Sequence, residues 1–413
     1  MAATLASIRK LHGGTVAPSS TLIYVEKRGL FLKRLPDGQA IQLTSGTALR
    51  HPDFSPSGRW IAYRDGDLWH VISAEGGEPK QLAAGPSAWN PAVDILTISS
   101  PNAGTQLFGA ATGWRPSRLA NSGNNLPVFS PDGKDFVFAR DLMSVMAAAG
   151  SSRVSDLMLG SVARANAEAS VLASSTSAGF IPYGWSRDGK HIFYWEDRDF
   201  SASVMADGLA LFGLSHDTGL LQPLNIKTLV YDDWLASSPS SDLLAVTSGI
   251  GRESWNNKRI AVWNPQTAQL RYLSDKHVSS IAPAWSPDGR KLAHVSGRRR
   301  RASRVAKLQS VFLVSDASWF KAWQRGATPK AITPDSEDRE ECPIWIDKDQ
   351  LLICRIDQND TATVWLIDSE GTRAKQVSGP LSTENGWFRY YDYVNLRALF
   401  DWLPAGAGNN ATP

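Results

Sequence analysis

The sequence predicts an all-β protein in which one four-stranded antiparallel unit recurs along a single domain. Three observations lead to this prediction: a short turn phrase returns along the chain, each copy precedes an alternating apolar run, and Gly, Pro and Asp separate the runs. The 413 residues include 33 Gly, 23 Pro and 16 Trp. That composition supplies the tight turns and the large buried side chains that repeated β units need.

The phrase consists of an aromatic residue, Ser, Pro, an Asp-Gly pair or a close substitute, and a basic residue. Proline fixes φ at the start of a turn and glycine supplies a positive φ, so each copy predicts a tight connection between two strands. Strong copies lie at 54–59, 129–134, 185–190 and 285–290. Weaker copies lie at 89–91, 237–239 and 345–347, and a degraded eighth lies at 391–393.

A third and a fourth strand follow each phrase, and four antiparallel strands make one blade of a β-propeller. The phrases are spaced by roughly 48 residues, which suits blades with some enlarged loops. We therefore expect eight blades, with seven as the alternative. The segment near the N-terminus lacks an opening phrase, and we expect residues 387–394 to supply its innermost strand and so close the ring. The expected boundaries are a tail at 1–16, the propeller at 17–403 and a tail at 404–413.

These phrases resemble the PD40 repeats of TolB-like, WD40-like propellers, which also occur in the propeller domains of prolyl-oligopeptidase-type peptidases. The resemblance covers nearly the whole chain. It implies the fold and says little about function, since such propellers include scaffolds, gating domains and a few lyases. No hydrolase domain follows the repeats within these 413 residues, so the resemblance does not imply a peptidase.

Charge and cysteine content exclude several classes of function. A formal net charge of +3 argues against nucleic acid as a partner, and the longest apolar runs are too short to span a membrane. The N-terminus lacks the pattern of a signal peptide, so we expect a cytoplasmic protein, with a secreted or periplasmic protein after signal removal as the alternative. The two cysteines, Cys342 and Cys354, are expected to be buried thiols rather than a bridge or a redox pair.

Four consecutive units have long connections between their second and third strands, at 141–154, 196–208, 249–258 and 297–309. In a propeller these connections lie on one face, where they form a crown that is suited to binding a partner. A basic run in the last of them is either a solvated loop or a clamp for anions. An aromatic insertion at 319–323 predicts a second partner patch on the opposite face, with packing against the propeller as the alternative. The expected partner-binding residues are Met143, Met146, Phe200, Met205, Trp255, Arg298, Arg299, Arg300, Arg301, Trp319, Phe320 and Trp323.

The second candidate site is the axial funnel, which the innermost strands line. Carboxylates with one histidine can hold a divalent cation or act as a general acid and base, although strand alternation turns half of such residues into the packing between blades. The expected funnel residues are His51, Asp53, Tyr183, Asp232, Asp233, Glu341, Arg389 and Asp392.

These features favour binding over catalysis. The chain has no GxSxG, HExxH, CxxC or glycine-rich phosphate motif, and we expect no cofactor and no metal centre. The leading hypothesis is a scaffold propeller that binds a protein partner through the long loops. The alternatives are a lyase or hydrolase that acts on a sugar or peptide in the funnel, and a lectin-like or anion-binding module; a small ligand or divalent cation in the funnel remains an alternative partner.

Overall fold

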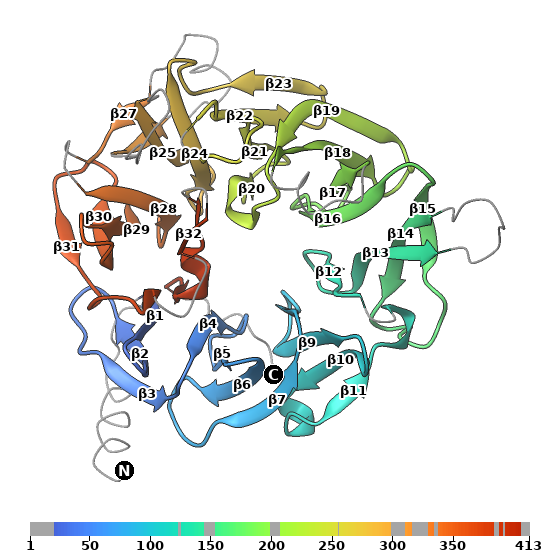
Figure 1. Ribbon diagram of the computed structural model, residues 1–413, viewed down its shortest axis with the longest axis horizontal. Coiled ribbons are helices and arrows are strands. Elements are labelled where there is room, and N and C mark those ends of the chain that lie inside the picture. Colours follow the sequence, from blue (N-terminus) through green and yellow to red (C-terminus); the bar gives the residue numbers. More distant parts are fainter. Residues whose placement is uncertain are drawn as a thin grey trace.

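The computed structural model describes residues 20–122, 125–143, 153–198, 207–254, 256–298, 310–315, 329–333, 338–383, 388–390 and 393–405. Within these residues the strands form eight four-stranded antiparallel sheets, which follow one another around a central axis (Figure 1). An all-β propeller of four-stranded antiparallel blades is therefore confirmed. A separate two-stranded hairpin, β32 (Phe388–Tyr390) with β33 (Tyr393–Val394), lies at the inner side of the ring.

We number the blades from the N-terminus and give their strands from the axis outward. Blade 1 contains β34 (Phe400–Leu403), β1 (Thr21–Glu26), β2 (Gly29–Arg34) and β3 (Ile41–Ser45). Blade 2 contains β4 (Leu49–Phe54), β5 (Trp60–Asp65), β6 (Leu68–Ser73) and β7 (Lys80–Ala84). Blade 3 contains β8 (Ser87–Trp89), β9 (Ile95–Ser100), β10 (Gly104–Gly109) and β11 (Pro116–Arg118). Blade 4 contains β12 (Val128–Phe129), β13 (Asp135–Met143), β14 (Arg153–Ser161) and β15 (Ser170–Ser175).

The second half of the ring repeats this order. Blade 5 contains β16 (Gly179–Trp185), β17 (His191–Asp197), β18 (Leu209–Ser215) and β19 (Leu221–Thr228). Blade 6 contains β20 (Leu235–Ser237), β21 (Leu244–Ser248), β22 (Arg259–Asn264) and β23 (Gln269–Tyr272). Blade 7 contains β24 (Val278–Trp285), β25 (Lys291–Arg298), β26 (Ser310–Ser315) and β27 (Lys330–Ala331). Blade 8 contains β28 (Arg339–Trp345), β29 (Gln350–Ile356), β30 (Ala362–Asp368) and β31 (Ala374–Gln376).

The turn phrase joins the first and second strands of a blade, and its side chains explain its composition. In blade 4 the Ser130 hydroxyl donates to Asp132 at 2.7 Å and accepts from the backbone of Asp135 at 3.0 Å. Gly133 follows with a φ of 69°, which favours glycine. The serine and aspartate therefore satisfy the turn's polar groups internally, and the same bonds recur at 186–191 and 286–291.

In blades 5, 7 and 8 the aromatic residue of the phrase bonds to the preceding blade. The indole Nε1 of Trp185 donates to Val128, that of Trp285 to Ala236, and that of Trp345 to Ala284, each at 3.0 Å. Every acceptor is a backbone carbonyl in the innermost strand of the preceding blade. Because a buried tryptophan needs a partner for its N–H group, these bonds fix the spacing of neighbouring blades at the axis.

The ring closes through a strand that the sequence analysis placed wrongly. The innermost strand of blade 1 is β34, which pairs antiparallel with β1 from Thr21–Leu403 to Tyr24–Phe400. Residues 387–394 do not supply it: their described strands, β32 and β33, pair with each other. The degraded phrase at 391–393 was misassigned, because Trp402-Leu403-Pro404 occupies the equivalent place in blade 1.

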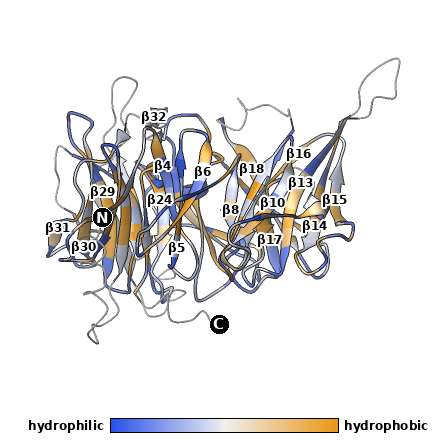
Figure 2. Ribbon diagram, turned by 90° about the horizontal axis from the view of Figure 1, so that it is seen from below, coloured by the Kyte–Doolittle hydropathy of each residue, from blue (hydrophilic) through white to orange (hydrophobic). Residues whose placement is uncertain are grey.

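Hydrophobic residues lie between blades and along their strands, while polar residues gather at the connections on the two faces (Figure 2). We call the face with the connections between second and third strands, and between successive blades, the upper face. Tryptophans pack between blades: the ring centroids of Trp60 and Trp114 of blade 3 lie 5.0 Å apart, and those of Trp263 and Phe193 of blade 5 lie 5.8 Å apart.

Cys342 and Cys354 are both buried free thiols, as expected. Across the described ranges, no helix has the length and apolar character needed to cross a membrane.

Candidate functional site

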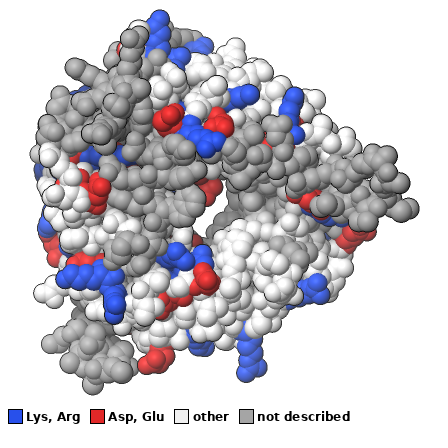
Figure 3. Space-filling view, in the orientation of Figure 1, with Lys and Arg blue, Asp and Glu red and all other residues white. Residues whose placement is uncertain are grey.

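A cavity of about 380 Å³ opens beside the axis on the upper face. Its walls come from β4, from the turn that joins β5 to β6, from the connection that leads to blade 3, and from the closing segment of blade 1. Acidic and basic side chains both lie near the central opening on this face (Figure 3). The lining residues are His51, Pro52, Asp53, Arg64, Trp69, Gly85, Pro86, Ser87, Asp232, Arg397, Phe400 and Asp401.

The innermost strand β4 is bulged where it lines this cavity. Its register with β5 shifts between Arg50 and Asp53, and His51 adopts a φ of 51°, which is unusual for a residue with a side chain. Equivalent shifts occur in β24 and β28, at Ala282 and Cys342, and in each case a proline follows. Since a bulge redirects the side chains of one strand, these repeats of Xaa-Pro change which residues face the axis.

Asp53 and Asp401 form a hydrogen-bonded carboxyl pair at the cavity wall. Burial and the charge of Asp401 raise the pKa of Asp53 well above its usual value, and burial also raises the pKa of Asp401. Asp401 accepts from the backbone N–H of Phe54 at 2.9 Å and pairs with Arg397 at 3.2 Å, and these partners favour its ionised form and a proton on Asp53. The pair joins β34 of blade 1 to β4 of blade 2, across the seam of the ring.

Asp232 and Asp233 lie in the connection from blade 5 to blade 6, in a short 3-10 helix, Asp232–Trp234. Asp232 is exposed on the cavity wall. Asp233 accepts a hydrogen bond from the Tyr393 hydroxyl at 2.9 Å, and burial raises the pKa of Asp233 to about 7. The Tyr393 ring stacks on Tyr231 with centroids 3.7 Å apart, so the C-terminal hairpin is fixed over the inner edge of blade 6.

Basic groups occupy the other walls. The Arg397 guanidinium lies 4.4 Å from the centroid of the Trp402 ring. Its charge favours the ionised forms of Asp232 and Asp233, but burial has the larger effect, so the pKa of each carboxyl is raised. Arg64 pairs with Asp67 at 3.2 Å. Burial and the charges of Arg64 and Arg50 lower the pKa of His51 to about 4, so its imidazole is neutral at pH 7. The cavity thus offers carboxyl and guanidinium groups together, with the Trp69 ring as an aromatic wall.

Three of the expected funnel residues, His51, Asp53 and Asp232, meet in this cavity, and Asp233 lies beside Asp232. Tyr183 donates to the carbonyl of Leu235 at 2.7 Å and serves the contact between blades 5 and 6. Glu341 is buried and paired with Arg339. Arg389 lies in β32, and its side chain is outside the described residues, as is all of Asp392.

The second strands of blades 4 to 7 end, and their third strands begin, on the upper face. Of the four expected crown connections, the one at 249–258 is described apart from residue 255, and the other three fall largely outside the described residues. Met143 and Arg298 end strands β13 and β25, but their side chains are outside the described residues. The remaining expected partner-binding residues also fall outside the described residues: Met146, Phe200, Met205, Trp255, Arg299, Arg300, Arg301, Trp319, Phe320 and Trp323.

Sequence reasoning missed Arg397 and Asp401, which both line the cavity. Both belong to the closing segment that was assigned to other residues. Trp402-Leu403-Pro404 resembles the aromatic-Ser-Pro start of the turn phrase, which marks the end of an innermost strand. Recognising it as such would have placed Asp401 in the innermost strand of blade 1, beside the axis. Where the structure describes the chain, no group of three or more His, Cys, Asp or Glu side chains is arranged to hold a metal ion.

Replacing Asp53 with asparagine is expected to stabilise the protein at neutral and alkaline pH. The pKa of Asp53 is higher in the folded protein than in the unfolded chain, so protonated Asp53 contributes to the free energy of unfolding. This contribution is complete below about pH 4, the usual pKa of aspartate, and is lost as the pH rises through the pKa of the folded protein. Asparagine stays neutral and still donates to Asp401. Chemical denaturation should show that the variant is more stable than wild type at pH 8 and that the two proteins are equally stable near pH 4.

The matched control is Asp401→Asn, which removes the charge that pairs with Arg397 and should destabilise the protein at pH 8. A pH-independent difference between Asp53→Asn and wild type would contradict the assignment of the proton to Asp53.

No protein-family model matches the chain. No curated protein matches it either. Among solved structures, a eukaryotic initiation factor is similar with a TM-score of 0.50 and 12% identity, over 88% of this chain and 97% of that one. The chain is a β-propeller. At such identity the likeness concerns the fold alone.

Two further structures are similar at lower scores. TolB from Acinetobacter baumannii gives a TM-score of 0.37 and 13% identity, over 87% of this chain and 79% of that one. Prolyl oligopeptidase B from Galerina marginata gives 0.49 and 11%, over 91% of this chain and 53% of that one, so this chain spans about half of the peptidase's length.

Proposed function

We propose that this propeller binds a protein partner on its upper face, with a segment of the partner entering the axial cavity. The observation that supports this most directly is the position of the cavity: it opens on the face where the second strands of blades 4 to 7 end and their third strands begin. A rigid ring that presents variable connections and one central recess is a common arrangement for recognition.

The chemistry of the cavity suits a polypeptide segment. Trp69 is held in place by its own hydrogen bond to Gly85 at 2.8 Å, so its ring is a fixed apolar surface. Exposed Asp232 and the guanidinium of Arg397 can pair with charged side chains of either sign. A mixed set of this kind gives specificity through several polar contacts rather than through one strong charge.

Catalysis in the funnel is less well supported. A general acid and base need hydrogen-bonding capacity that is directed at a substrate. Asp401 instead accepts from Phe54, Arg397 and Asp53, which are all parts of the seam. The carboxyl pair therefore acts first as a structural link between blades 1 and 2.

Site-specific photo-crosslinking tests the proposal. A benzoylphenylalanine at Asp67, which is exposed beside the cavity, should capture a defined partner from native lysate. The same probe at Leu220, which is 60% exposed in a turn on the opposite face, should not capture it. Adding Asp232→Arg should reduce capture at position 67 at least tenfold without changing the denaturation midpoint. Equal capture at both positions, or no effect of Asp232→Arg, would contradict the proposal.

A further inference from the structure

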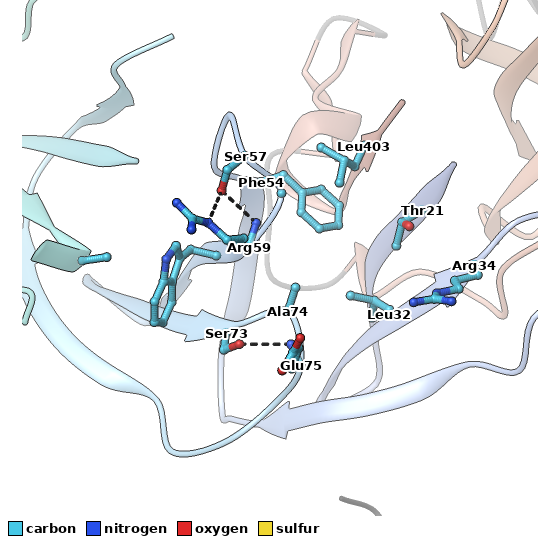
Figure 4. Close-up of a pocket in the computed structure, with 13 residues that line it drawn as sticks. Thr21, Leu32, Arg34, Phe54, Ser57, Arg59, Ser73, Ala74, Glu75 and Leu403 are labelled. Atoms are coloured by element: carbon cyan, nitrogen blue, oxygen red, sulfur yellow. Dashed lines mark hydrogen bonds between the residues drawn. The ribbon is translucent and has the colours of Figure 1, made fainter. Parts of the chain in front are cut away.

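A second cavity, of about 560 Å³, lies on the lower face at the seam between blades 1 and 2. We call it the seam pocket. Figure 4 shows Thr21, Leu32 and Arg34 of blade 1 on one side and Ser57 and Arg59 of blade 2 on the other, with Phe54 and Leu403 at one end. The remaining lining residues are Gly58, Trp60, Ser73, Ala74, Glu75 and Ala110.

The junction at the seam is lined by two apolar side chains, one from blade 1 and one from blade 2. Blades 5, 7 and 8 bring a tryptophan from their phrase against the preceding blade, whereas blade 2 brings Phe54, as blade 4 brings Phe129, and phenylalanine has no N–H group. Four phrases carry a buried serine after the aromatic residue, but the closing strand carries Leu403 there. Phe54 and Leu403 together give this junction an apolar wall.

Glycine at position 58 leaves room for the Leu403 side chain at one end of the pocket. Its φ is 70°, and a Cβ there would lie 2.2 Å from Cδ2 of Leu403. Leu403 therefore packs directly on the turn of blade 2, and its side chain forms a continuous apolar surface with Phe54, which is 7% exposed, and Leu32, which is 9% exposed.

The polar part of the pocket is predominantly basic. The Arg59 side chain is 71% exposed. Its Nε donates to the Ser57 hydroxyl at 3.1 Å, and its Nη2 donates to the Asp94 carboxylate at 3.3 Å. Arg34 lies on the opposite wall (Figure 4). Glu75 is the one acidic side chain among the described lining residues. An apolar end with arginines on both sides is complementary to an anion that has an apolar body.

We propose that the seam pocket binds a small amphipathic carboxylate. Its apolar body lies against Phe54, Leu32 and Leu403, and its carboxylate pairs with Arg59 and Arg34. Because the walls belong to two neighbouring blades, such a ligand binds the assembled ring and stabilises it by mass action. The site is on the face opposite the axial cavity, so this inference does not depend on the partner proposed above.

The test compares three compounds that share one apolar body: 4-phenylbutyrate, 4-phenylbutanamide and 4-phenylbutylamine. Isothermal titration calorimetry should show the carboxylate binding at least tenfold more tightly than the amide, and the amine binding more weakly still. Arg34→Gln combined with Arg59→Gln should abolish the preference for the carboxylate. Arg118→Gln, an exposed arginine of blade 3, is the control and should leave all three affinities unchanged.

Two further measurements separate the pocket from a general charge effect. Ala74→Trp fills the pocket without altering charge and should prevent binding of 4-phenylbutyrate, while circular dichroism reports that the variant is folded. Hydrogen exchange should show stronger protection of the Val25 and Phe54 amides, which bond across the seam, when 4-phenylbutyrate is bound. Equal affinity for the three compounds, retained binding in Ala74→Trp, or unchanged protection of these amides would overturn the proposal.

Discussion

Replacing Glu340 with alanine is expected to cost about 3–5 kcal/mol of the free energy of unfolding, the usual range when one partner of a buried ion pair is removed. The Glu340 side chain is completely buried in β28, where it accepts from Arg355 Nε at 3.0 Å and from the Thr333 hydroxyl. Arg355 is itself 16% exposed and stacks on Trp365 at 4.5 Å. Alanine would leave this guanidinium buried without its carboxylate. Urea denaturation measures the loss.

A double-mutant cycle distinguishes the pair from general damage to blade 8. Removing both charges, in Glu340→Ala with Arg355→Met, should recover at least half of the loss, because no unpaired charge then remains buried. Additive losses for the two substitutions would show that the ion pair does not carry the effect.

Lys258→Met is expected to destabilise the protein by about 2–4 kcal/mol, because three partly buried hydrogen bonds to carbonyl groups are lost. The ammonium group of Lys258 donates to Ile250 at 3.0 Å and to Gly251 and Asn256 at 2.9 Å each. The residue is fully buried, and burial lowers its pKa to about 8. One side chain therefore holds the connection from β21 to β22, which is one of the four crown connections.

The control for this substitution is Lys276→Met, at an exposed lysine before blade 7, which should change stability by less than about 0.5 kcal/mol. Limited proteolysis should cut Lys258→Met within 249–258 sooner than wild type. A variant with wild-type stability and proteolysis would show that solvent satisfies these carbonyls.

The fold followed from the sequence because the turn phrase combines several independent constraints. Ser, Asp and Gly satisfy one turn, and the aromatic residue contacts the preceding blade, so a copy is recognisable even when its strands vary. The closing strand was harder to place. The closing strand β34 comes last among the described strands in sequence but belongs to blade 1. The residues that follow it therefore do not lead into β1, the second strand of that blade.

The funnel could be predicted only in part for a related reason. His51, Asp53 and Asp232 precede recognisable elements, so their approach to the axis follows from blade geometry. The bulges at Xaa-Pro positions change the alternation of innermost strands, and simple alternation cannot tell which neighbour faces the channel. Arg397 comes from a 3-10 helix outside the repeat, Leu396–Ala398, and no periodic pattern predicts its position.

The pairing of β1 with β34 also sets the order in which the ring can be completed during synthesis. The outer three strands of blade 1 are synthesised before the other blades, yet the strand that covers their inner edge is synthesised after every other blade. Throughout that interval, β1 and the neighbouring β4 are exposed on one side to the growing chain and to solvent. A folding chain of this kind is exposed to mispairing at one specific edge until residues 400–403 emerge.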